Sequence, residues 1–578
     1  MTFSEKKYIR LRLILIGIVF TMLFGAIGTK AAYLQIFRTS WLSSKAADQY
    51  TWDLVKQGRR GTIYDANHIE MAVSIDTTSV AAYPRMISDP DRTAGVLAKA
   101  LDLNKRNVKR KLISKRSFVW LKRQVTPRET NAVSALEITG IDFIPAYGRF
   151  YPNRGLAASV LGFSGTEGRG LEGLEYRYEN YLQGPTRKVT VLKDALGRGF
   201  NEEKEDHDSE GGNNLVLTID RNIQYIAENA LQEAVTRFSA RSGMAIVMAP
   251  KTGAILALAQ NPNFNPNAFG SYDKELWRNR AITDPFEPGS TMKIFSAAAA
   301  IESGICTPNT IFFCENGSFK VGKHTVHDTH PHDWLSLQQI VKYSSNIGAV
   351  KVGQSIDQEF LYTVLRNFGF GQKTGIDCPG ETSGSLASWK RWSSIDAGAI
   401  AFGQGMSVSA VQLAAAVSAI ANDGILMKPY VVQAITDTNG RLIKNTTPQK
   451  IRQVVSSETA RTVRRILRTV TTSGGTGVQA ALEGYTVCGK TGTAQKVDRS
   501  GGYAKGKYVA SFVGFVPARA PKLTILVVID EPEKQHYGGI VAAPVFRTIA
   551  EESLNYLNIP SRKPETPLRA AQTGKVMG

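Results

Sequence analysis

An uncharged, strongly hydrophobic run occupies residues 13–29, near the start of the 578-residue chain. A membrane span needs about 17–25 such residues, whereas the core of a cleavable signal peptide has about 7–15. The run therefore predicts a retained transmembrane anchor. Basic residues precede it, and the positive-inside rule then places residues 1–12 in the cytoplasm as a short tail. These residues are Lys6, Lys7, Arg10 and Arg12.

Beyond the anchor, residues 30–57 mix apolar and polar positions at helical spacing, which predicts a juxtamembrane helix. A short strand at 215–219 then precedes a helix that Asp220 can cap. A β-hairpin is predicted over 244–259. Further strands are predicted at 485–487, 508–515 and 523–529. Hairpin strands at both ends with helices between them favour an α+β fold, in which one antiparallel sheet is flanked by helices.

The composition is that of a folded chain, with 43% hydrophobic and 21% charged residues. Its net charge of +20 suits an anionic partner. Because the anchor indicates export, we expect no nucleic acid, and anionic lipid or an acidic wall polymer is favoured instead. Residues 104–123 are rich in lysine and arginine. They predict a solvated helix face, with a docking surface as the alternative.

Four cysteines are too few for a disulfide scaffold, and none forms a C-x-x-C pair. Cys306 and Cys314 are close enough in sequence to bridge, but isolated buried thiols are favoured. A histidine-rich stretch follows at residues 324–332, with histidines at 324, 327, 330 and 332. Its spacing matches no zinc pattern, so we expect neither a metal nor another cofactor.

Candidate chemistry begins at Pro288-Gly289, a turn signal that an alanine-rich helical run follows. This places Ser290 at the N-cap or in the first turn, with Lys293 on the same face. A cation in the first turn opposes the helix dipole, and apolar neighbours bury it, so the pKa of Lys293 should fall. Ser290 beside a neutral lysine is an activated nucleophile. An ordinary N-cap with a solvated lysine is the simpler alternative.

Two later motifs weaken that alternative. They are Ser344-Ser345-Asn346, at a polar break between two predicted helices, and Lys490-Thr491-Gly492-Thr493, where a strand meets an exposed edge. The order S-x-x-K, S-x-N, K-T-G resembles the penicillin-binding proteins. Three upstream segments resemble pedestal signatures of class B members, with Ala66-Asn67-His68 where the family usually has Arg, Asn and Gly. These segments are 59–65, 149–152 and 170–175.

The resemblance implies an α+β transpeptidase fold with an N-terminal mixed α/β pedestal, the dimerisation domain of the family, and one transmembrane helix. It divides the chain into a pedestal at 58–205 and a transpeptidase domain at 206–557, with a disordered tail at 558–578. Residues 201–213 are charged and poor in large apolar residues, which predicts a flexible connector or a hairpin tip. The pedestal signatures are expected to hold that domain against the catalytic one.

The same resemblance assigns roles in a D,D-transpeptidase. Lys293 accepts the proton of Ser290, which attacks the D-Ala-D-Ala bond of a stem peptide. Ser344 relays a proton to the leaving amine, and Asn346 holds the substrate amide and Lys293. Lys490 acts electrostatically near Ser344, and Thr491 binds the substrate carboxylate. Thr491, Gly492 and Thr493 belong to the strand beside which the substrate peptide lies as an added strand. The backbone N–H groups of Ser290 and Thr493 form the oxyanion hole.

The implied function is cross-linking of peptidoglycan stem peptides through an acyl-enzyme, with an amine from a second stem as acceptor and β-lactams as covalent inhibitors. The segment 286–290 and the chain length favour the septal branch over the elongation branch. We expect an anchor in the plasma (inner) membrane, a catalytic domain on its outer (periplasmic) face, and a membrane-embedded glycan polymerase and other division proteins as partners. A β-lactam sensor or β-lactamase, and a non-catalytic division scaffold, are the alternatives.

Overall fold

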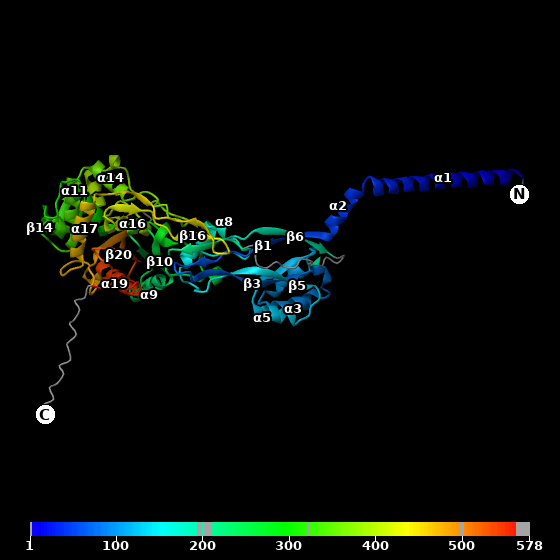
Figure 1. Cartoon of the computed structure of the whole chain (residues 1–578), viewed down its shortest axis with the longest axis horizontal. Coiled ribbons are helices and arrows are strands. Elements are labelled where there is room, and N and C mark those ends of the chain that lie inside the picture. The colour runs from blue at the N-terminus through cyan, green and yellow to red at the C-terminus, as the bar shows by residue number, and fades with distance from the viewer. Residues whose placement is uncertain (1–2, 194–198, 201–210, 322–323, 498–501, 562–578) are drawn as a thin grey trace, which may run out of the picture. The chain divides into compact units, whose positions relative to one another are not determined.

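Figure 1 shows a computed structural model of the chain, which describes residues 3–193, 199–200, 211–321, 324–497 and 502–561. Two compact units are present. The first comprises Met1–Gly58, Asp76–Gly148 and Pro185–Glu210, and the second comprises Arg59–Ile75, Arg149–Gly184 and Gly211–Gly578. Most of the connector expected at 201–213 and of the tail expected at 558–578 lies outside the described residues.

The first unit begins with the long helix α1 (Phe3–Ile36). Its part Lys6–Ile36 is long and apolar enough to cross a membrane and is not buried in the fold, which fits the anchor predicted at 13–29. Helix α2 (Thr39–Tyr50) and strand β1 (Thr51–Gln57) follow. The single juxtamembrane helix predicted over 30–57 is therefore wrong in two respects. The helix is interrupted between Ile36 and Thr39, and residues 51–57 form a strand. Thr51, Trp52 and Val55 are strand-forming residues, which accounts for β1.

Strand β1 pairs antiparallel with β6 (Thr186–Lys193), which pairs with β7 (Gly199–Phe200). The rest of the first unit packs helices against the second half of β3 (Glu70–Ala82) and its partners. These elements are α3 (Pro90–Ala100), α4 (Lys105–Leu112), β4 (Val119–Val125), α5 (Pro127–Ser134) and β5 (Ile141–Phe150). Helix α4 buries Val108 and Leu112 and exposes most of its basic side chains, as predicted for a solvated face.

The second unit is built on a five-stranded antiparallel sheet with the strand order β10-β9-β21-β20-β19. Its strands are β9 (Ser242–Met248), β10 (Ile255–Asn261), β19 (Cys488–Val497), β20 (Tyr503–Val516) and β21 (Leu523–Asp530). The predicted hairpin is β9–β10, whereas the strand predicted at 485–487 begins only at Cys488. Because β19 is last in the order, one of its edges is unpaired within this sheet.

Helices cover both faces of this sheet. Alternate strand residues such as Val247 and Phe512 pack with α9 (Arg221–Arg237) and α19 (Ala543–Tyr556), which lie side by side in Figure 1. The residues between them, such as Ile246, pack with the buried helix α16 (Ala410–Ala421). Asp220 caps α9 as predicted, accepting from the N–H groups of Asn222 and Ile223. The α+β fold with a helix-flanked antiparallel sheet is confirmed.

Shorter elements complete the second unit. A second sheet runs β17 (Leu442–Asn445), β16 (Val432–Thr436), β8 (Asn214–Leu217), β2 (Ile63–Tyr64) and the first part of β3. The remaining strand pairs are β11 (Ile311–Phe313) with β14 (Trp334–Ser336), β12 (Ser318–Val321) with β13 (His324–His327), and β15 (Ile425–Met427) with β18 (Lys450–Gln453). The longer remaining helices are α11 (Lys293–Glu302), α12 (Leu337–Tyr343), α13 (Asn346–Ser355), α14 (Gln358–Asn367), α15 (Ser394–Ala401) and α17 (Ser457–Val470). Helices of a single turn are α6 (Ala158–Leu161), α7 (Gly173–Arg177), α8 (Glu179–Leu182), α10 (Arg280–Thr283) and α18 (Gly538–Val541).

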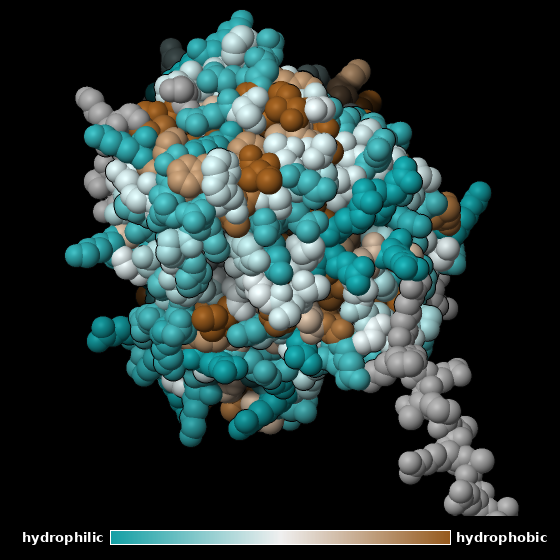
Figure 2. Space-filling model, turned by 90° about the vertical axis from the view of Figure 1, so that its left-hand side faces the viewer, coloured by the Kyte–Doolittle hydropathy of each residue, from teal (hydrophilic) through white to brown (hydrophobic). Residues whose placement is uncertain are grey.

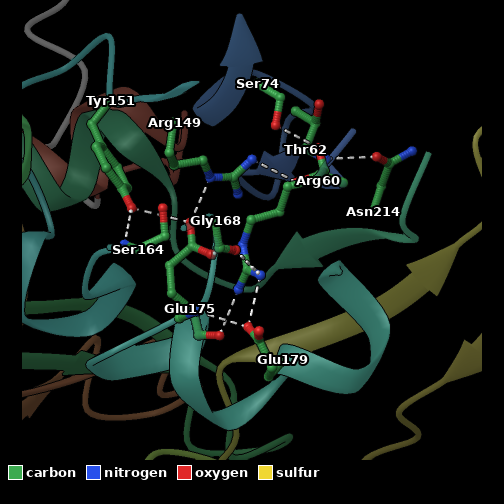
Figure 3. Close-up of polar contacts among 12 residues, drawn as sticks. Arg60, Thr62, Ser74, Arg149, Tyr151, Ser164, Gly168, Glu175, Glu179 and Asn214 are labelled. Atoms are coloured by element: carbon green, nitrogen blue, oxygen red, sulfur yellow. Dashed lines mark hydrogen bonds and ion pairs between the residues drawn. The ribbon is translucent and has the colours of Figure 1, made fainter. Parts of the chain in front are cut away.

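The three pedestal signatures meet in a buried ion network inside the second unit (Figure 3). The Glu175 carboxylate lies between Arg60 Nε, at 2.5 Å, and Arg149 Nε, at 2.6 Å. Arg60 also pairs with Glu179 at 2.7 Å, and the hydroxyl of Tyr151 donates to Glu175 at 3.2 Å. Burial opposes ionisation of Glu175, but the two guanidiniums hold its pKa below the usual range. The signatures therefore connect three distant stretches of chain.

The face of the second unit that Figure 2 shows is mainly polar. Figure 2 views the end of the molecule that carries α11, α14 and β14 in Figure 1, and hydrophobic side chains appear there as separate patches among polar ones. Isolated exposed apolar residues are normal for a soluble domain. The large buried clusters of apolar side chains lie around the five-stranded sheet and its helices.

Candidate active site

The turn before α11 sets the position of Ser290. Residues Gly289–Met292 form one turn of 3₁₀ helix, and α11 continues from Lys293. Gly289 has a positive φ of 53°, and its N–H donates to the carbonyl of Gly403 at 3.1 Å. A Cβ on Gly403 would lie 2.1 Å from the Gly289 carbonyl oxygen, so two backbones meet here. Ser290 is therefore held in the first turn, as the sequence predicts.

Lys293 Nζ lies within hydrogen-bond distance of four oxygen atoms. These are Ser290 Oγ at 2.7 Å, Asn346 Oδ1 at 2.7 Å, the Ser344 carbonyl oxygen at 2.9 Å and Ser344 Oγ at 3.3 Å. A neutral amine has two N–H donors and one lone pair. Carbonyl and amide oxygens only accept, so the two N–H groups point to Ser344 O and Asn346. The lone pair is then left for the hydroxyl proton of Ser290.

The surroundings of Lys293 favour this neutral form. Its side chain is 1% exposed, and burial lowers the pKa of Lys293 to about 7, against the opposing attraction of the Asp328 carboxylate. A large fraction of the amine is therefore unprotonated near neutral pH. Ser290 and Lys293 together have the geometry and the protonation state of a nucleophile and its base.

Ser344 and Asn346 flank the break between α12 and α13, as the sequence predicts. Ser344 ends α12 in the left-handed region, with a φ of 64°. Non-glycine residues adopt this conformation uncommonly, and such residues often have functional roles. It turns both the carbonyl and the hydroxyl of Ser344 towards Lys293. Asn346 is the first residue of α13, and its amide nitrogen donates to the His327 carbonyl at 3.0 Å.

Lys490 lies on β19 and reaches the same hydroxyl. Its Nζ lies 2.9 Å from Ser344 Oγ and 3.0 Å from the carbonyl oxygen of Thr491. Burial, followed by the nearby charge of Lys293, strongly lowers the pKa of Lys490. Ser344 Oγ thus lies between two lysine nitrogens, which gives a proton a short path between the two amines.

Thr491, Gly492 and Thr493 follow on β19 at the sheet edge. A Cβ on Gly289 would lie 3.1 Å from the Thr493 carbonyl oxygen, so β19 runs directly beside the Ser290 turn. A Cβ on Gly492 would lie 2.3 Å from Ser511 Oγ and 3.0 Å from Thr291 Cγ2. Only glycine fits between the strand and the turn at that position. An extended peptide can add to this free edge.

Three further segments also contact the site. Thr476, in 473–477, shares a hydrogen bond of 3.0 Å with Thr491 Oγ1. The N–H of Gly538 donates to Thr493 Oγ1 at 3.1 Å. The N–H of Gly405 donates to Glu287 Oε1 at 2.9 Å, which ties that segment to the turn before Ser290.

Asp328 is a site residue that no motif in the linear sequence marks. It lies within the histidine-rich stretch, and its carboxylate accepts from Ser345 Oγ at 2.5 Å. The only available signal is an acidic residue close to polar ones ahead of the S-x-N motif, and this signal is too common to be informative. Among the described residues, no group of three or more His, Cys, Asp or Glu side chains is arranged to hold a metal ion. All four cysteines are free and buried in the structure, Cys306 and Cys314 included.

Family models match most of the chain. The penicillin-binding protein transpeptidase domain matches residues 243–551, and the penicillin-binding protein dimerisation domain matches residues 55–217. The chain is a class B penicillin-binding protein. It is therefore a peptidoglycan D,D-transpeptidase of the serine type.

Named relatives support this assignment over almost the whole length of the penicillin-binding protein. It is 35% identical over 552 residues to the probable peptidoglycan D,D-transpeptidase PenA of Neisseria gonorrhoeae, covering 94% of this chain and 92% of PenA. It is 33% identical over 561 residues to the peptidoglycan D,D-transpeptidase FtsI of Escherichia coli, covering 93% and 92%. It is also 33% identical to stage V sporulation protein D of Bacillus subtilis, covering 96% and 87%. The structure resembles penicillin-binding protein 3 of Mycobacterium tuberculosis in complex with aztreonam, with a TM-score of 0.69, 29% identity and coverage of 88% and 99%.

Proposed function

We propose that this transpeptidase cross-links peptidoglycan stem peptides during septal wall synthesis, through an acyl-enzyme on Ser290. The observation that carries the catalytic part is the arrangement of Lys293, with its two N–H groups directed to oxygen acceptors and its lone pair to Ser290. The septal assignment is supported by the likeness of segment 286–290 to the septal branch.

Acylation follows from these contacts. The D-alanyl end of a donor peptide adds as a strand along β19, with its terminal carboxylate near Thr491. Lys293 takes the proton of Ser290, whose Oγ attacks the carbonyl carbon of the penultimate D-alanine. The backbone N–H groups of Ser290 and Thr493 stabilise the oxyanion. The C–N bond then breaks, and a proton moves from Lys293 through Ser344 to the departing amine of D-alanine, with Lys490 beside the path.

Transpeptidation reverses this proton flow. The amine of a second stem peptide attacks the ester carbonyl, and Lys293 or Ser344 removes its excess proton. Collapse of the tetrahedral intermediate returns the proton to Ser290 Oγ and forms the new amide cross-link. Water in place of the amine gives carboxypeptidase activity. A β-lactam keeps its leaving group tethered, so its acyl-enzyme should persist.

Membrane attachment completes the proposal. The helix Lys6–Ile36 is suited to a single span, and the basic residues ahead of its apolar part favour a cytoplasmic N-terminus. The catalytic unit then lies on the outer face, where the stem peptides are. Because cross-linking needs glycan strands, we also propose a membrane-embedded glycan polymerase and other division proteins as partners. Alkaline phosphatase fused after residue 561 should be active in cells, and the same enzyme fused before residue 3 should be inactive.

The catalytic part is tested by intact mass of residues 59–561 incubated with penicillin, followed by peptide mapping. The adduct should map to Ser290, and Ser290→Ala should remove it while Ser303→Ala, at the end of α11, should not. An undiminished adduct in Ser290→Ala would overturn the proposal. Rapid nitrocefin turnover by the wild-type protein would instead favour a β-lactamase.

The septal role is tested by depletion in the native host. Filamentous cells with incomplete septa are expected, because elongation continues while division stops. Rounded cells would indicate the elongation branch. Complementation by Ser290→Ala would favour a scaffold whose catalysis is dispensable.

A further inference from the structure

A carboxylate from outside the three motifs lies at the start of α13. Asp328 Oδ1 accepts from the backbone N–H groups of Asn346, at 2.5 Å, and Ile347, at 3.1 Å. Its Oδ2 accepts from Ser345 Oγ at 2.5 Å. Ser345 Oγ in turn accepts from the N–H of Gly348 at 2.9 Å. One carboxylate therefore holds consecutive residues of the S-x-N motif.

The residue next to Asp328 orients the Asn346 side chain. The His327 carbonyl accepts from Asn346 Nδ2 at 3.0 Å. A carbonyl can only accept, so this contact turns the amide oxygen the other way, towards Lys293 Nζ at 2.7 Å. The pair His327-Asp328 thus determines both where the Asn346 backbone lies and which amide atom faces the lysine.

The Asp328 carboxylate lies next to Ser345, which is the middle residue of the S-x-N motif. In the S-D-N form of the motif, an aspartate stands at that position. Here the carboxylate comes from a residue 17 positions upstream and reaches the motif through the hydroxyl of Ser345. An acidic group is therefore present at the motif even though the motif itself lacks one.

We propose that Asp328 is a positioning residue for acylation: by holding the Asn346 backbone and Ser345, it keeps the Asn346 amide oxygen on Lys293 and so leaves the lysine lone pair on Ser290. This proposal rests on the proposed acylation of Ser290. It gives the Asp328 carboxylate a role in the reaction rather than only in capping α13, although it never touches the substrate.

The charge of Asp328 also acts on the base. Burial lowers the pKa of Lys293, and the Asp328 carboxylate partly restores it. The other groups that face Lys293 are the hydroxyls of Ser290 and Ser344, the Asn346 amide and, beyond Ser344, the amine of Lys490. Asp328 is the acidic group whose charge raises the pKa of Lys293. Removal of its charge should therefore lower the pKa of Lys293 further.

The experiment measures the rate constant of acylation by a fluorescent penicillin from pH 5.5 to 9 for wild type, Asp328→Asn and Asp333→Asn. Asp328→Asn keeps the shape and two acceptor contacts but loses the charge. A loss of up to about 100-fold is expected at pH 8, because a displaced base costs about that much. The acidic limb of the plot of rate against pH should also move to lower pH. Asp333 is an exposed aspartate five residues further along the chain. Asp333→Asn should match wild type both in the rate at pH 8 and in the position of the acidic limb.

Three outcomes would overturn the proposal. The first is an Asp328→Asn rate within twofold of wild type. The second is an acylation rate that falls by the same factor at every pH together with a lower melting temperature, because a purely structural role would produce this combination. The third is a shift of the acidic limb to higher pH.

If wild type itself forms no adduct on Ser290, the proposed function fails instead. If Asp328→Asn does not fold, Ser345→Ala removes the connecting hydroxyl, and it should lower the rate without moving the limb; an unchanged rate would count against the proposal.

Discussion

Lys490 Nζ lies 2.9 Å from Ser344 Oγ, although 146 residues separate the two in the chain. The same hydroxyl lies 3.3 Å from Lys293 Nζ, so Ser344 connects Lys293 of α11 with Lys490 of β19. This link joins a helix, a helix break and a strand, which no short segment of the sequence brings together.

Ser344→Ala should lower the rate constant of acylation by about 10²–10⁴-fold, because a positioned proton relay contributes about that much. The fold should be retained, since the hydroxyl is only partly buried and alanine leaves the backbone intact. Stopped-flow measurement with a fluorescent penicillin checks the rate. Ser303→Ala, at the end of α11, is the matched control. A rate equal to wild type would show that protons reach the leaving amine by another route.

The pH dependence should follow Lys293. Its pKa of about 7 means that the amine is largely protonated below that pH and free above it, so acylation should rise through neutral pH and then level off. Lys293→Arg should be inactive at every pH, because a guanidinium does not release its proton. A rate that falls between pH 6 and 8 in the wild-type enzyme would contradict the assignment of Lys293 as the base.

Two glycines near the nucleophile offer a matched comparison. Both Gly403 and Gly405 have positive φ, of 89° and 75°. A Cβ on Gly403 would lie 2.1 Å from the Gly289 carbonyl oxygen, whereas a Cβ on Gly405 meets nothing within 4 Å. Gly405→Ala should therefore cost only about 1–2 kcal/mol of strain. Gly403→Ala should cost about 3 kcal/mol, through overpacking and strain, and should displace Ser290. Thermal unfolding and penicillin acylation distinguish the two.

The buried network around Glu175 predicts a large effect on stability. Arg60 and Arg149 flank its carboxylate with side chains that are 5% and 4% exposed. Glu175→Gln removes the carboxylate that pairs with Arg149 and leaves Arg60 with Glu179, and should cost about 3–5 kcal/mol of unfolding free energy. The pKa of Glu175 lies below its ordinary value, so its stabilisation is present at neutral pH and is lost as the pH falls below about 4.5.

Urea unfolding at pH 7 and pH 4 measures this effect. Glu172→Gln is the control, since burial raises the pKa of that carboxyl and a neutral side chain suits its site. It should change the unfolding free energy by no more than about 0.5 kcal/mol. If both variants unfold at the same urea concentration, the network contributes nothing measurable.

Local patterns predict much of this structure. Asp220 caps its helix, the 244–259 hairpin forms, and the turn at Pro288-Gly289 puts Ser290 and Lys293 on one face, because each depends on neighbours within a few residues. The strand at Thr51–Gln57 contradicts a helical pattern, since pairing with β6 overrides local spacing. Its partner begins at Thr186, far along the chain.

Contacts between distant segments are the part that one sequence leaves open. The motifs predict that Ser344 and Lys490 approach Ser290 only because a resemblance supplies the fold. Asp328 has no such guide, because its role depends on the path of the β12–β13 hairpin back to α13. The grouping of Arg60, Arg149 and Glu175 likewise follows from tertiary contacts that no spacing rule contains.

The packing of α11 limits how this enzyme can acquire drug resistance. All residues from Lys293 to Ala300 are buried, and four of them are consecutive alanines. Any larger side chain there would push the nucleophile out of line for the natural peptide as well as for the antibiotic. Selection by β-lactams should therefore leave this helix unchanged and act on residues outside it.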